Sequence, residues 1–458
     1  MSKRIVVIGG GYVGLVSGAC LAELGHRVTI IERDSRKVAI LQGGGVPIHE
    51  PGLAELIAKC RDAGRLDFTD HYDKAQLAFA DAAFICVGTP SRPFDNRADT
   101  SSVFAAAGDI LKYAGPRTVI VVKSTVPVGT GDEIAAMVAG AGRVVAGNPE
   151  FLREGSAIGD FMSPDRIVIG TEDEQALEVL TEIYRGQTDA GAPLVSVSRR
   201  EAELIKYAAN SFLAIKITFI NEIANLCEAV GADVDHIASG IGLDRRIGRN
   251  FLKAGPGFGG SCFPKDMVAL MGTAHDHGVS LRTLETAILV NDARKGEMIR
   301  KIVQAAGGSV AGRTIAVLGL AFKAGTDDMR SAPSLTILPG LVRLGARIVA
   351  YDPEAMDAAR PLLPEPEVTM AGSAMDAARG ADLAVILTEW PEFASMDFES
   401  LVANLNAPTL VDLRNIVDRD AAARAGLTLI GIGKPAPLSG AGNEHTPAMR
   451  QAHPRNTV

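Results

Sequence analysis

The sequence predicts an α/β protein with two doubly wound, Rossmann-like domains joined by a long central helix. Two series of short β-branched runs, each separated by amphipathic segments, predict two parallel sheets covered by helices. Between the two series, residues 194–230 contain neither glycine nor proline, which predicts one long helix. We therefore divide the chain into an N-terminal domain (1–197), a central helical region (198–310), a C-terminal domain (311–433) and a tail (434–458).

Each sheet is predicted from its own set of runs. In the first series the expected strands are Arg4–Ile8, Arg27–Ile31, Ala83–Val87, Thr118–Val122, Val144–Ala146 and Arg166–Ile169. In the second they are Thr314–Leu318, Arg347–Tyr351, Leu383–Leu387, Thr409–Val411 and Leu427–Ile430. The tail is rich in proline, glycine, alanine and polar residues, which predicts disorder.

The central helix has a predicted start and end. Ser198-Arg199-Arg200-Glu201 has the form of a capping box, and Gly231 is suited to end a helix. Such a helix has about 30 residues and a length of about 45 Å, which is too long for a crossover between strands. Its largely apolar body predicts a buried contact between two copies, and we expect a homodimer.

Composition excludes several classes of protein. A net charge of −8 argues against a general nucleic-acid binder, which needs a basic surface. No apolar run reaches the roughly 18 residues needed to span a bilayer. The five cysteines follow no CxxC spacing, and His275 and His277 would lie on different faces of a helix, so we expect reduced thiols, no metal site and a cytoplasmic location.

The first predicted strand runs into a dinucleotide-binding fingerprint. Gly9-Gly10-Gly11-Tyr12-Val13-Gly14 follows the strand and opens a helix, where glycines allow a tight turn and close approach to a pyrophosphate. Glu32 ends the second strand, where a carboxylate would bind ribose hydroxyls and favour NAD over NADP. Arg33, Arg36 and Lys37 weaken that preference, because a 2′-phosphate could recruit them.

Two further strand ends carry ligand-type residues. Val87–Ser91 and Lys123–Pro127 both lie at the sheet edge where open α/β sheets bind ligands, although strand exits that end in proline are also ordinary turns.

A cysteine in a glycine-rich run is the strongest chemical signal. Cys262 lies in Gly257-Phe258-Gly259-Gly260-Ser261-Cys262-Phe263-Pro264-Lys265-Asp266, a run unlike that of a packed core thiol. Together with a hydride acceptor, a nucleophilic cysteine predicts oxidation through a covalent intermediate. We expect Lys206 and Lys265 to lower the pKa of the thiol, and the glycines to leave room for a substrate.

Two acidic or basic clusters are ambiguous by themselves. Glu150 and Glu154 lie in one loop, which fits either a site or a solvated surface. Glu203, Lys206, Tyr207 and Asn210 share one helix face, where Lys206 and Asn210 could together donate to an oxyanion, or Glu203 and Lys206 could form an exposed pair.

The C-terminal series lacks a second fingerprint. Its first turn, Gly319–Gly325, does not have the glycine spacing, so a second dinucleotide is not expected. Lys323 and Arg330 are cations suited to a nucleotide diphosphate. Asp352 stands where a ribose-binding acid would be, but an Asp-Pro turn is the simpler role.

Taken together, these motifs resemble the UDP-glucose 6-dehydrogenases, a family within the nucleotide-sugar dehydrogenases. The resemblance covers residues 1 to about 433 and includes Gly9–Gly14, Pro47–Leu53, Lys123–Pro127, Asn148–Gly155, Glu203–Asn210, Asn221-Glu222, Arg246–Gly248, Phe251–Lys253, the Cys262 run, Phe322-Lys323 and Arg414. Two positions depart from the family pattern: Glu32 replaces the usual aspartate, and His49 stands where tyrosine is common.

The resemblance implies a four-electron oxidation of UDP-glucose at C6 to UDP-glucuronate. Two hydrides pass to NAD, while Cys262 holds the sugar first as a thiohemiacetal and then as a thioester that water hydrolyses. It further implies oxyanion and substrate contacts by Lys206 and Asn210, a held water or proton acceptor at Asp266 and Thr125, and an acid/base at Glu150.

The binding residues implied by the resemblance form two sets. The cofactor set is Gly9, Gly11, Tyr12, Val13, Gly14, Glu32, Lys37, Thr89, Thr125, Glu154, Lys265 and Arg330. The substrate set is Glu150, Phe151, Leu152, Arg153, Lys206, Asn210, Arg246, Phe251, Lys253, Gly257, Phe258, Gly259, Phe322, Lys323 and Arg414, with Arg246 in position to reach a neighbouring subunit.

Two other functions stay open. A GDP-mannose 6-dehydrogenase would carry nearly the same motifs, although Phe263 after the cysteine favours UDP-glucose. A non-catalytic sensor of nucleotide sugars could use the same fold, but it would not need Cys262, Lys206, Asn210, Asp266 and Glu150 together.

Overall fold

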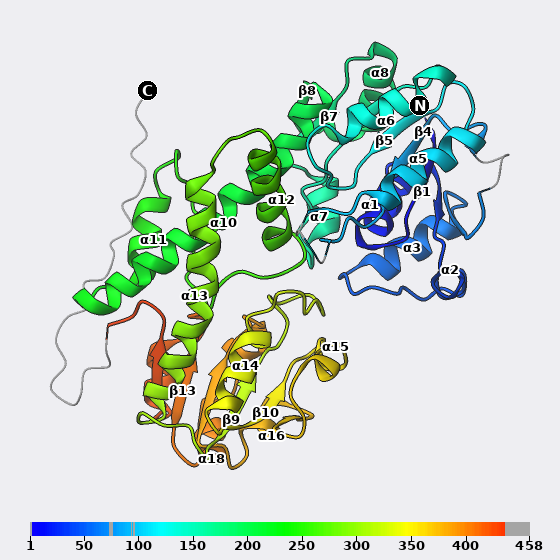
Figure 1. Cartoon of the computed structure of the whole chain (residues 1–458). Helices are drawn as coiled ribbons and strands as arrows, with labels where there is room; N and C mark the ends of the chain where they lie inside the picture. The colour runs from blue at the N-terminus through cyan, green and yellow to red at the C-terminus, as the bar shows by residue number, and fades with distance from the viewer. Residues whose placement is uncertain (1, 73–76, 93, 95–96, 436–458) are drawn as a thin grey trace, which may run out of the picture.

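The computed structural model describes residues 2–72, 77–92, 94 and 97–435. Figure 1 shows an N-terminal α/β domain in blue and cyan, a C-terminal α/β domain in yellow to red, and green helices between them. The predicted fold class, two α/β domains joined by a long central helix, is confirmed. Of the predicted tail, the residues from 436 onward lie outside the described part.

The N-terminal sheet has eight strands in the order β3-β2-β1-β4-β5-β6-β7-β8. The strands are β1 Arg4–Ile8, β2 Arg27–Ile31, β3 Leu66–Thr69, β4 Ala82–Ile85, β5 Val119–Val122, β6 Val145–Gly147, β7 Ile167–Gly170 and β8 Leu194–Val197. Of these, β3 and β8 were not predicted. The pairing of β6 with β7 is antiparallel, so the last two strands run against the first six.

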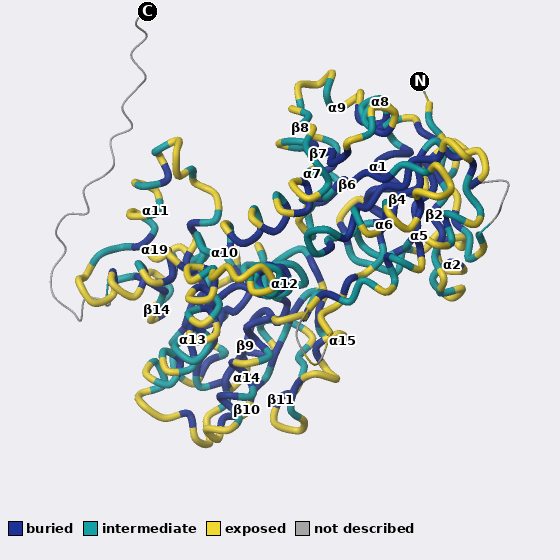
Figure 2. The backbone as a smooth tube through the Cα atoms, turned by 45° about the horizontal axis from the view of Figure 1, so that its top comes forward, coloured by how far each residue is buried: buried dark blue, intermediate teal, exposed yellow. Residues whose placement is uncertain are grey.

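Helices cover both faces of this sheet. On one face, a hydrophobic core joins the strands to α1 (Tyr12–Glu23), α3 (Leu53–Asp62) and α7 (Ala157–Met162). On the other, a second core joins them to α5 (Ser101–Tyr113) and α6 (Thr130–Val138). Because β4 and β5 are buried on both faces, they are continuously apolar, and Figure 2 shows the central strands in dark blue.

The central helix α10 spans Arg199–Val230, and both of its predicted ends are correct. The Ser198 side chain accepts from the Glu201 N–H in a complete capping box, and Gly231 ends the helix at φ 73°. One face of α10 is buried. On the opposite face Phe212, Phe219 and Leu226 are 63%, 48% and 57% exposed, and their seven-residue spacing places them in one apolar stripe.

Two more long helices pack on α10 and lead to the C-terminal domain. They are α12 (Phe263–Asp276) and α13 (Arg282–Ala305), with the shorter α11 (Val234–Gly242) following α10 directly. No helix in the described part of the chain is long and apolar enough to cross a membrane.

The C-terminal sheet has six parallel strands in the order β11-β10-β9-β12-β13-β14. They are β9 Thr314–Leu318, β10 Arg347–Tyr351, β11 Val368–Met370, β12 Leu383–Ile386, β13 Thr409–Asp412 and β14 Thr428–Gly431, of which β11 was not predicted.

After β14 the chain returns to the central helices. The Val234 N–H donates to the carbonyl of Gly433 at 2.8 Å, and the Gly433 N–H donates to the Glu228 carboxylate at 2.7 Å. Lys434 forms ion pairs with Asp233 and Asp235. The last described residues are therefore docked on α10 and α11.

Candidate active site

The glycine loop between β1 and α1 is shaped for a phosphate-bearing ligand. A Cβ on Gly14 would clash with the carbonyl oxygen of Gly9, and one on Gly9 would lie 2.6 Å from the carbonyl oxygen of Cys86. These two glycines therefore allow the loop, the helix and the exit of β4 to pack closely. A Cβ on Gly11 would meet no atom within 4 Å, so the space before the α1 N-terminus is open to a ligand.

A carboxylate stands beside this loop as the fingerprint requires. Glu32 accepts from the Gly10 N–H at 2.8 Å and from the Asp34 N–H at 2.9 Å, so its position at the end of β2 is fixed. Lys37 lies further along, in α2 (Ser35–Gln42). Together, the open helix N-terminus and the fixed acid fit a dinucleotide.

A cavity of about 700 Å³ extends from the glycine loop along the carboxyl edge of the first sheet. Its lining includes these members of the predicted cofactor set: Gly11, Tyr12, Val13, Thr89, Thr125, Glu154, Lys265 and Arg330. The Thr89 hydroxyl donates to the Thr125 carbonyl at 2.8 Å, which joins two of the strand exits singled out in the sequence. Of the predicted set, Gly9, Gly14, Glu32 and Lys37 are absent from this lining.

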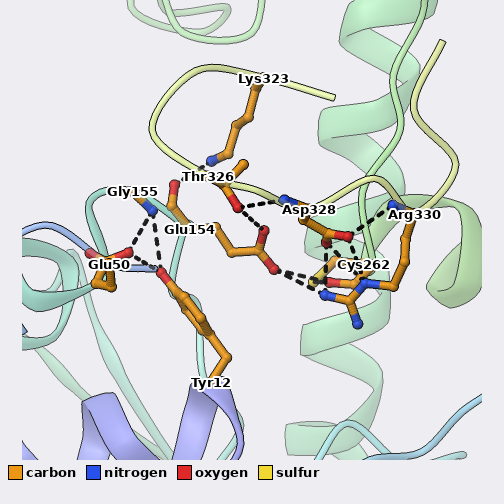
Figure 3. A network of polar contacts seen from close by, with 10 residues as sticks. Tyr12, Glu50, Glu154, Gly155, Cys262, Lys323, Thr326, Asp328 and Arg330 are labelled. Carbon is orange, nitrogen blue, oxygen red and sulfur yellow. Dashed lines mark hydrogen bonds and ion pairs between the residues drawn. The ribbon is translucent and has the colours of Figure 1, made fainter. Parts of the chain in front are cut away.

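Tyr12 connects the glycine loop to the boundary between the domains (Figure 3). Its hydroxyl donates to the buried Glu50 carboxylate, which also accepts from the Gly155 N–H at 2.6 Å and the Ala157 N–H at 2.8 Å. Gly155 has φ +80°, and a Cβ there would lie 2.8 Å from the carbonyl oxygen of Gly325 in the C-terminal domain. Glu50 therefore holds the loop that meets the second domain.

Glu154, the neighbouring residue, faces a cluster from the C-terminal domain. Its carboxylate lies 3.4 Å from the Arg330 guanidinium and accepts from the Thr326 hydroxyl at 3.3 Å, while Lys323 donates to its carbonyl oxygen at 2.6 Å (Figure 3). Burial and the nearby Asp328 carboxylate raise the pKa of Glu154. The predicted reading of this loop as a solvated surface is therefore excluded.

A second cavity, of about 550 Å³, meets the first at the cysteine. From the predicted substrate set it is lined by Glu150, Phe151, Leu152, Arg153, Lys206, Asn210 and Phe251. Four residues border both cavities: Lys123, Glu150, Leu152 and Cys262. Cys262 thus stands between a cofactor-shaped space and a second, separate space.

The thiol of Cys262 is placed by the start of α12. Cys262 immediately precedes that helix, and the Ser261 hydroxyl lies 3.4 Å from its sulfur. Burial raises the pKa of the Cys262 thiol; the Lys206 ammonium opposes this, but the Glu150 and Asp266 carboxylates add to it. The expectation that Lys206 lowers this pKa is confirmed, but burial and the two carboxylates outweigh its ammonium, so the net shift is upward.

Lys206 and Glu150 form a buried ion pair. Lys206 Nζ lies 3.0 Å from Glu150 Oε1, and the two residues are 3% and 7% exposed. Burial disfavours the charged form of Glu150. The pKa of its carboxyl is nevertheless held below the usual value by Lys206, the Leu152 N–H and Lys123. The alternative of an exposed pair between Glu203 and Lys206 is excluded, because both side chains are buried.

Asn210 and Asp266 form a second polar pair beside the cysteine. The Asn210 amide donates to Asp266 Oδ2 at 2.7 Å, and Lys265 Nζ lies 2.7 Å from Asp266 Oδ1. Asp266 is 1% exposed, so both oxygens are fixed within the protein. Lys265 thus neutralises Asp266 and is not the counter-charge of the thiol.

The glycines before Cys262 serve contact between the domains. A Cβ on Gly259 would clash with the carbonyl oxygen of Ser331, and a Cβ on Gly260 would lie 2.8 Å from the Phe322 ring. Gly257 has φ +112°, and the Phe258 N–H donates to the Asn291 side chain at 2.8 Å. The space beside Gly259 and Gly260 is thus taken by the C-terminal domain and that beside Gly257 by Asn291 of α13, while Gly260 also borders the first cavity.

The remaining predicted substrate residues do not all lie together. Arg414 donates to the Phe322 carbonyl at 2.8 Å, which places it beside Phe322 and Lys323 on the C-terminal domain. Lys253 is exposed, and the Arg246 side chain is 89% exposed and paired with Asp244. Arg246 and Lys253 line neither cavity.

Asp352 is hydrogen-bonded within the C-terminal domain. Its buried carboxylate accepts from the N–H groups of Leu320 and Ala321, at 2.6 and 3.1 Å. It also accepts from the Glu354 and Ala355 N–H groups, as the Asp-Pro turn predicts.

Three buried residues of this region were overlooked as site residues. Lys123 borders both cavities, Glu50 fixes Gly155, and the Glu203 carboxylate accepts from the Gly129 and Gly131 N–H groups at 2.6 and 2.7 Å at the start of α6. All three lay within motifs already singled out, but the partners of Glu203 are 74 and 72 residues distant and carried no local signal.

Comparison with known proteins agrees with this architecture. Three models of the UDP-glucose/GDP-mannose dehydrogenase family match: the NAD binding domain at residues 3–188, the central domain at 200–293 and the UDP binding domain at 316–419. A UDP-glucose 6-dehydrogenase of Rhizobium meliloti (strain 1021) is 52% identical over 94% of this chain and 100% of its own length. The UDP-glucose 6-dehydrogenase TuaD of Bacillus subtilis (strain 168) is 46% identical over 95% of this chain and 94% of its own.

Among solved structures, a UDP-glucose dehydrogenase from Pyrobaculum islandicum superposes with a TM-score of 0.85 at 38% identity, covering 95% of this chain and 98% of that one. The matches span all three parts of the chain in order. The chain therefore belongs to the UDP-glucose/GDP-mannose dehydrogenase family.

Proposed function

We propose that this protein oxidises the C6 alcohol of UDP-glucose to the carboxylate of UDP-glucuronate, as an NAD-dependent UDP-glucose 6-dehydrogenase. The observation that carries the proposal is the position of Cys262 and Glu150 at the junction of two cavities, of which one has the shape and residues of a dinucleotide site. A nucleophile at such a junction can hold one carbon while a cofactor enters and leaves. The activity named for the full-length relatives agrees with it.

The first cavity is assigned to NAD. Gly9, Gly11 and Gly14 would allow the pyrophosphate close to the α1 N-terminus, and Glu32 would accept from the adenosine ribose. Tyr12, Val13, Lys37, Thr89, Thr125, Glu154, Lys265 and Arg330 complete the proposed cofactor site. When bound, NAD accepts one hydride in each oxidation. A lower KM for NADP than for NAD would contradict the assignment of Glu32.

Cys262 retains the sugar between the two oxidations. At the aldehyde level of C6, its sulfur adds to the carbonyl carbon and the oxygen takes up the proton, which gives a thiohemiacetal. After the second oxidation the carbon is a thioester. Water then adds to that carbon, the C–S bond breaks, and the acid is released with Cys262 restored.

Neighbouring side chains complete the chemistry. Lys206 and Asn210 donate to the oxygen that gains negative charge, while Asp266 and Thr125 hold a water or proton acceptor near the reacting oxygen. Glu150 takes the proton of the attacking water, a role that needs an ionised carboxylate. The Lys206 ion pair keeps it ionised.

The sugar nucleotide lies between the domains. Phe151, Leu152, Arg153 and Phe251 border it from the second cavity, and the Lys253–Gly259 stretch with Phe322, Lys323 and Arg414 grips the UDP moiety. In this assignment residues 1–197 bind NAD, 198–310 form the helical core, and 311–433 bind the UDP-sugar. The tail, 434–458, is assigned no role.

The protein acts as a homodimer in the cytoplasm. The exposed stripe of Phe212, Phe219 and Leu226 on α10 supports a second copy as its partner, since a monomer would leave these side chains in water. Arg246 would then reach the site of the neighbouring subunit, which agrees with its exposure in one chain. Five scattered cysteines support a reducing compartment.

One assay tests the function. Two NADH per UDP-glucose are expected, with GDP-mannose in parallel as the rival substrate, and a Cys262→Ser variant should not complete conversion to the acid. Normal turnover of that variant to UDP-glucuronate would exclude the covalent route. Preference for GDP-mannose would favour the rival enzyme, and binding without turnover would favour a sensor.

A further inference from the structure

Lys123 is a buried lysine to which no role has been assigned. It directly follows β5, is 4% exposed, and borders both cavities together with Glu150 and Cys262. Three polar side chains border both cavities. Cys262 is the proposed nucleophile and Glu150 the proposed base, which leaves Lys123 without a role.

The hydrogen bonds of Lys123 go to neutral oxygens. Its Nζ donates to Asn148 Oδ1 at 3.1 Å and lies 3.5 Å from the Tyr184 hydroxyl, which itself donates to Asn148 Oδ1 at 2.5 Å. Among the ion pairs of the described residues, none within 4 Å joins Lys123 to a carboxylate. A buried ammonium without a direct counter-ion is costly, and it commonly marks a functional position.

The charged and titratable groups around Lys123 point to its purpose. They are Glu150 from the loop after β6, Cys86 at the exit of β4, Lys206 on α10, Cys20 on α1 and Tyr184 after α8 (Glu174–Ile183). Glu150 is the one carboxylate in this set, and in turn it faces Lys206, Lys123, Cys86 and Cys262. Burial lowers the pKa of Lys123, which Glu150 opposes, so the two charges favour each other.

We propose that Lys123 is a positioning residue which, together with Lys206, keeps the Glu150 carboxylate ionised during hydrolysis of the Cys262 thioester. In that step the water oxygen bonds to the carbonyl carbon, Glu150 takes one proton from the water, and the sulfur leaves as a thiolate. Lys206 is the direct ion-pair partner, but in this step it also faces the oxyanion. Lys123 also acts on the charge of Glu150, but it is not assigned to the oxyanion, since its hydrogen bond to Asn148 holds it in place.

The inference rests on the proposed function, and its test separates the two. Lys123→Gln removes the charge but keeps a donor for Asn148, whereas Lys123→Arg keeps the charge. Tyr184→Phe is the matched control, because it removes a hydroxyl from the same hydrogen-bonded group and leaves the ammonium. For each variant, the rate at which the covalent sugar adduct on Cys262 disappears is measured from pH 3.5 to 8 by rapid acid quench and protein mass spectrometry.

In Lys123→Gln the acidic limb of this profile should move to higher pH by about one unit, because an opposite charge near a carboxyl lowers its pKa by about that amount. On this acidic limb the adduct should then disappear up to about tenfold more slowly than in the wild type, while Lys123→Arg and Tyr184→Phe keep the wild-type limb. If Lys123→Gln does not fold, Lys123→Met takes its place, with thermal unfolding as the check.

An unmoved limb in a folded, neutral variant overturns the inference, and so does an equal shift in Tyr184→Phe, which would show a purely structural effect. Either result leaves the proposed function intact if wild-type protein yields two NADH per UDP-glucose. A wild-type protein that forms no adduct and no NADH overturns both.

Discussion

Lys206 and Glu150 form an ion pair 3.0 Å long at a position where neither side chain is more than 7% exposed. The two residues come from distant parts of the chain, since Lys206 lies on the central helix and Glu150 follows β6. A pair so deeply buried contributes little net stability, but removing one partner leaves the other as a buried, uncompensated charge.

Lys206→Met should therefore damage both stability and activity. We expect a loss of about 3 kcal/mol or more in the free energy of unfolding, measured by urea denaturation, because Glu150 is left unpaired. The kcat should fall about 100-fold or more, since a proposed oxyanion donor is lost. Adding Glu150→Leu should restore stability but not activity; a double variant with additive losses would contradict the pairing.

The Cys262 thiol should react slowly at neutral pH. Because burial raises its pKa, we expect little alkylation by iodoacetamide at pH 7 and a rise of about tenfold per pH unit toward pH 9. Lys206→Met should slow alkylation further, as the ammonium favours the thiolate. The other four cysteines are buried, so peptide mass spectrometry can follow Cys262 alone. Rapid alkylation at pH 6 with no rise in rate toward pH 9 would contradict this prediction.

Glu203 should give stability a pH dependence near neutrality. Burial raises its pKa to about 7, despite two N–H donors that favour the charged form. Between pH 4.5 and 7 the folded protein keeps a proton that the unfolded chain has lost. This group therefore lowers the free energy of unfolding as pH rises through that window, by up to about 3 kcal/mol.

In Glu203→Gln this contribution is absent. Relative to the variant, the wild type should be more stable at pH 5.5 than at pH 8, as measured by urea denaturation at both values. Glu222→Gln, an exposed carboxyl on the same helix, controls for the change in net charge. A difference that is the same at both pH values would show that Glu203 is ionised throughout.

Gly259→Ala should weaken the contact between the domains. Its Cβ would clash with the carbonyl oxygen of Ser331, and we expect a destabilisation of about 1–3 kcal/mol, seen as a lower Tm, with a raised KM for UDP-glucose. Gly272→Ala is the matched control, because it lies within α12 and its Cβ would come no closer than 3.8 Å to Arg97. That control should be neutral or stabilising by up to about 1 kcal/mol. Equal effects of both substitutions would contradict a specific clash.

Phe219→Asp should weaken self-association. It places a charge in the centre of the apolar stripe on α10, and we expect the dimer dissociation constant to rise at least about tenfold in analytical ultracentrifugation. Phe79→Asp, at a phenylalanine of the N-terminal domain that is 65% exposed, should leave the constant unchanged. A wild-type protein that sediments as a monomer at micromolar concentration would refute the dimer.

Local patterns predicted much of the fold. Strands β1, β2, β9 and β10 match their predictions to the residue, because each is a five-residue β-branched run with clear breaks at both ends. Both ends of α10 were predicted because a capping box and a left-handed glycine are local signals. The short strands β3, β8 and β11 were missed, since three or four residues of mixed polarity carry too weak a pattern.

The candidate site shows where such prediction ends. The motifs indicated Cys262, Lys206, Asn210 and Glu150, but neither the raised pKa of the thiol nor the pairing of Lys265 with Asp266 follows from residue type. Lys265 and Asp266 are adjacent, and which way their side chains turn does not follow from the sequence. The raised pKa of the thiol depends on burial, which arises only when segments more than 50 residues apart are packed together. The contacts of the glycines before Cys262 could not be predicted either, because they are made with the distant loop that contains Ser331.

The docking of Gly433 and Lys434 on the central helices has a mechanical consequence. The C-terminal domain is anchored to the same helical layer twice, where the chain enters β9 from α13 and where it returns to Glu228 and Val234. Between these two connections, one hydrophobic core continues from α10 and α13 into the C-terminal strands and includes Ile220, Ala224, Met298 and Ile302. The C-terminal domain is therefore fixed to the central helices by a shared core as well as by both of its chain ends, and this sets the place of Lys323 and Arg330 opposite Glu154.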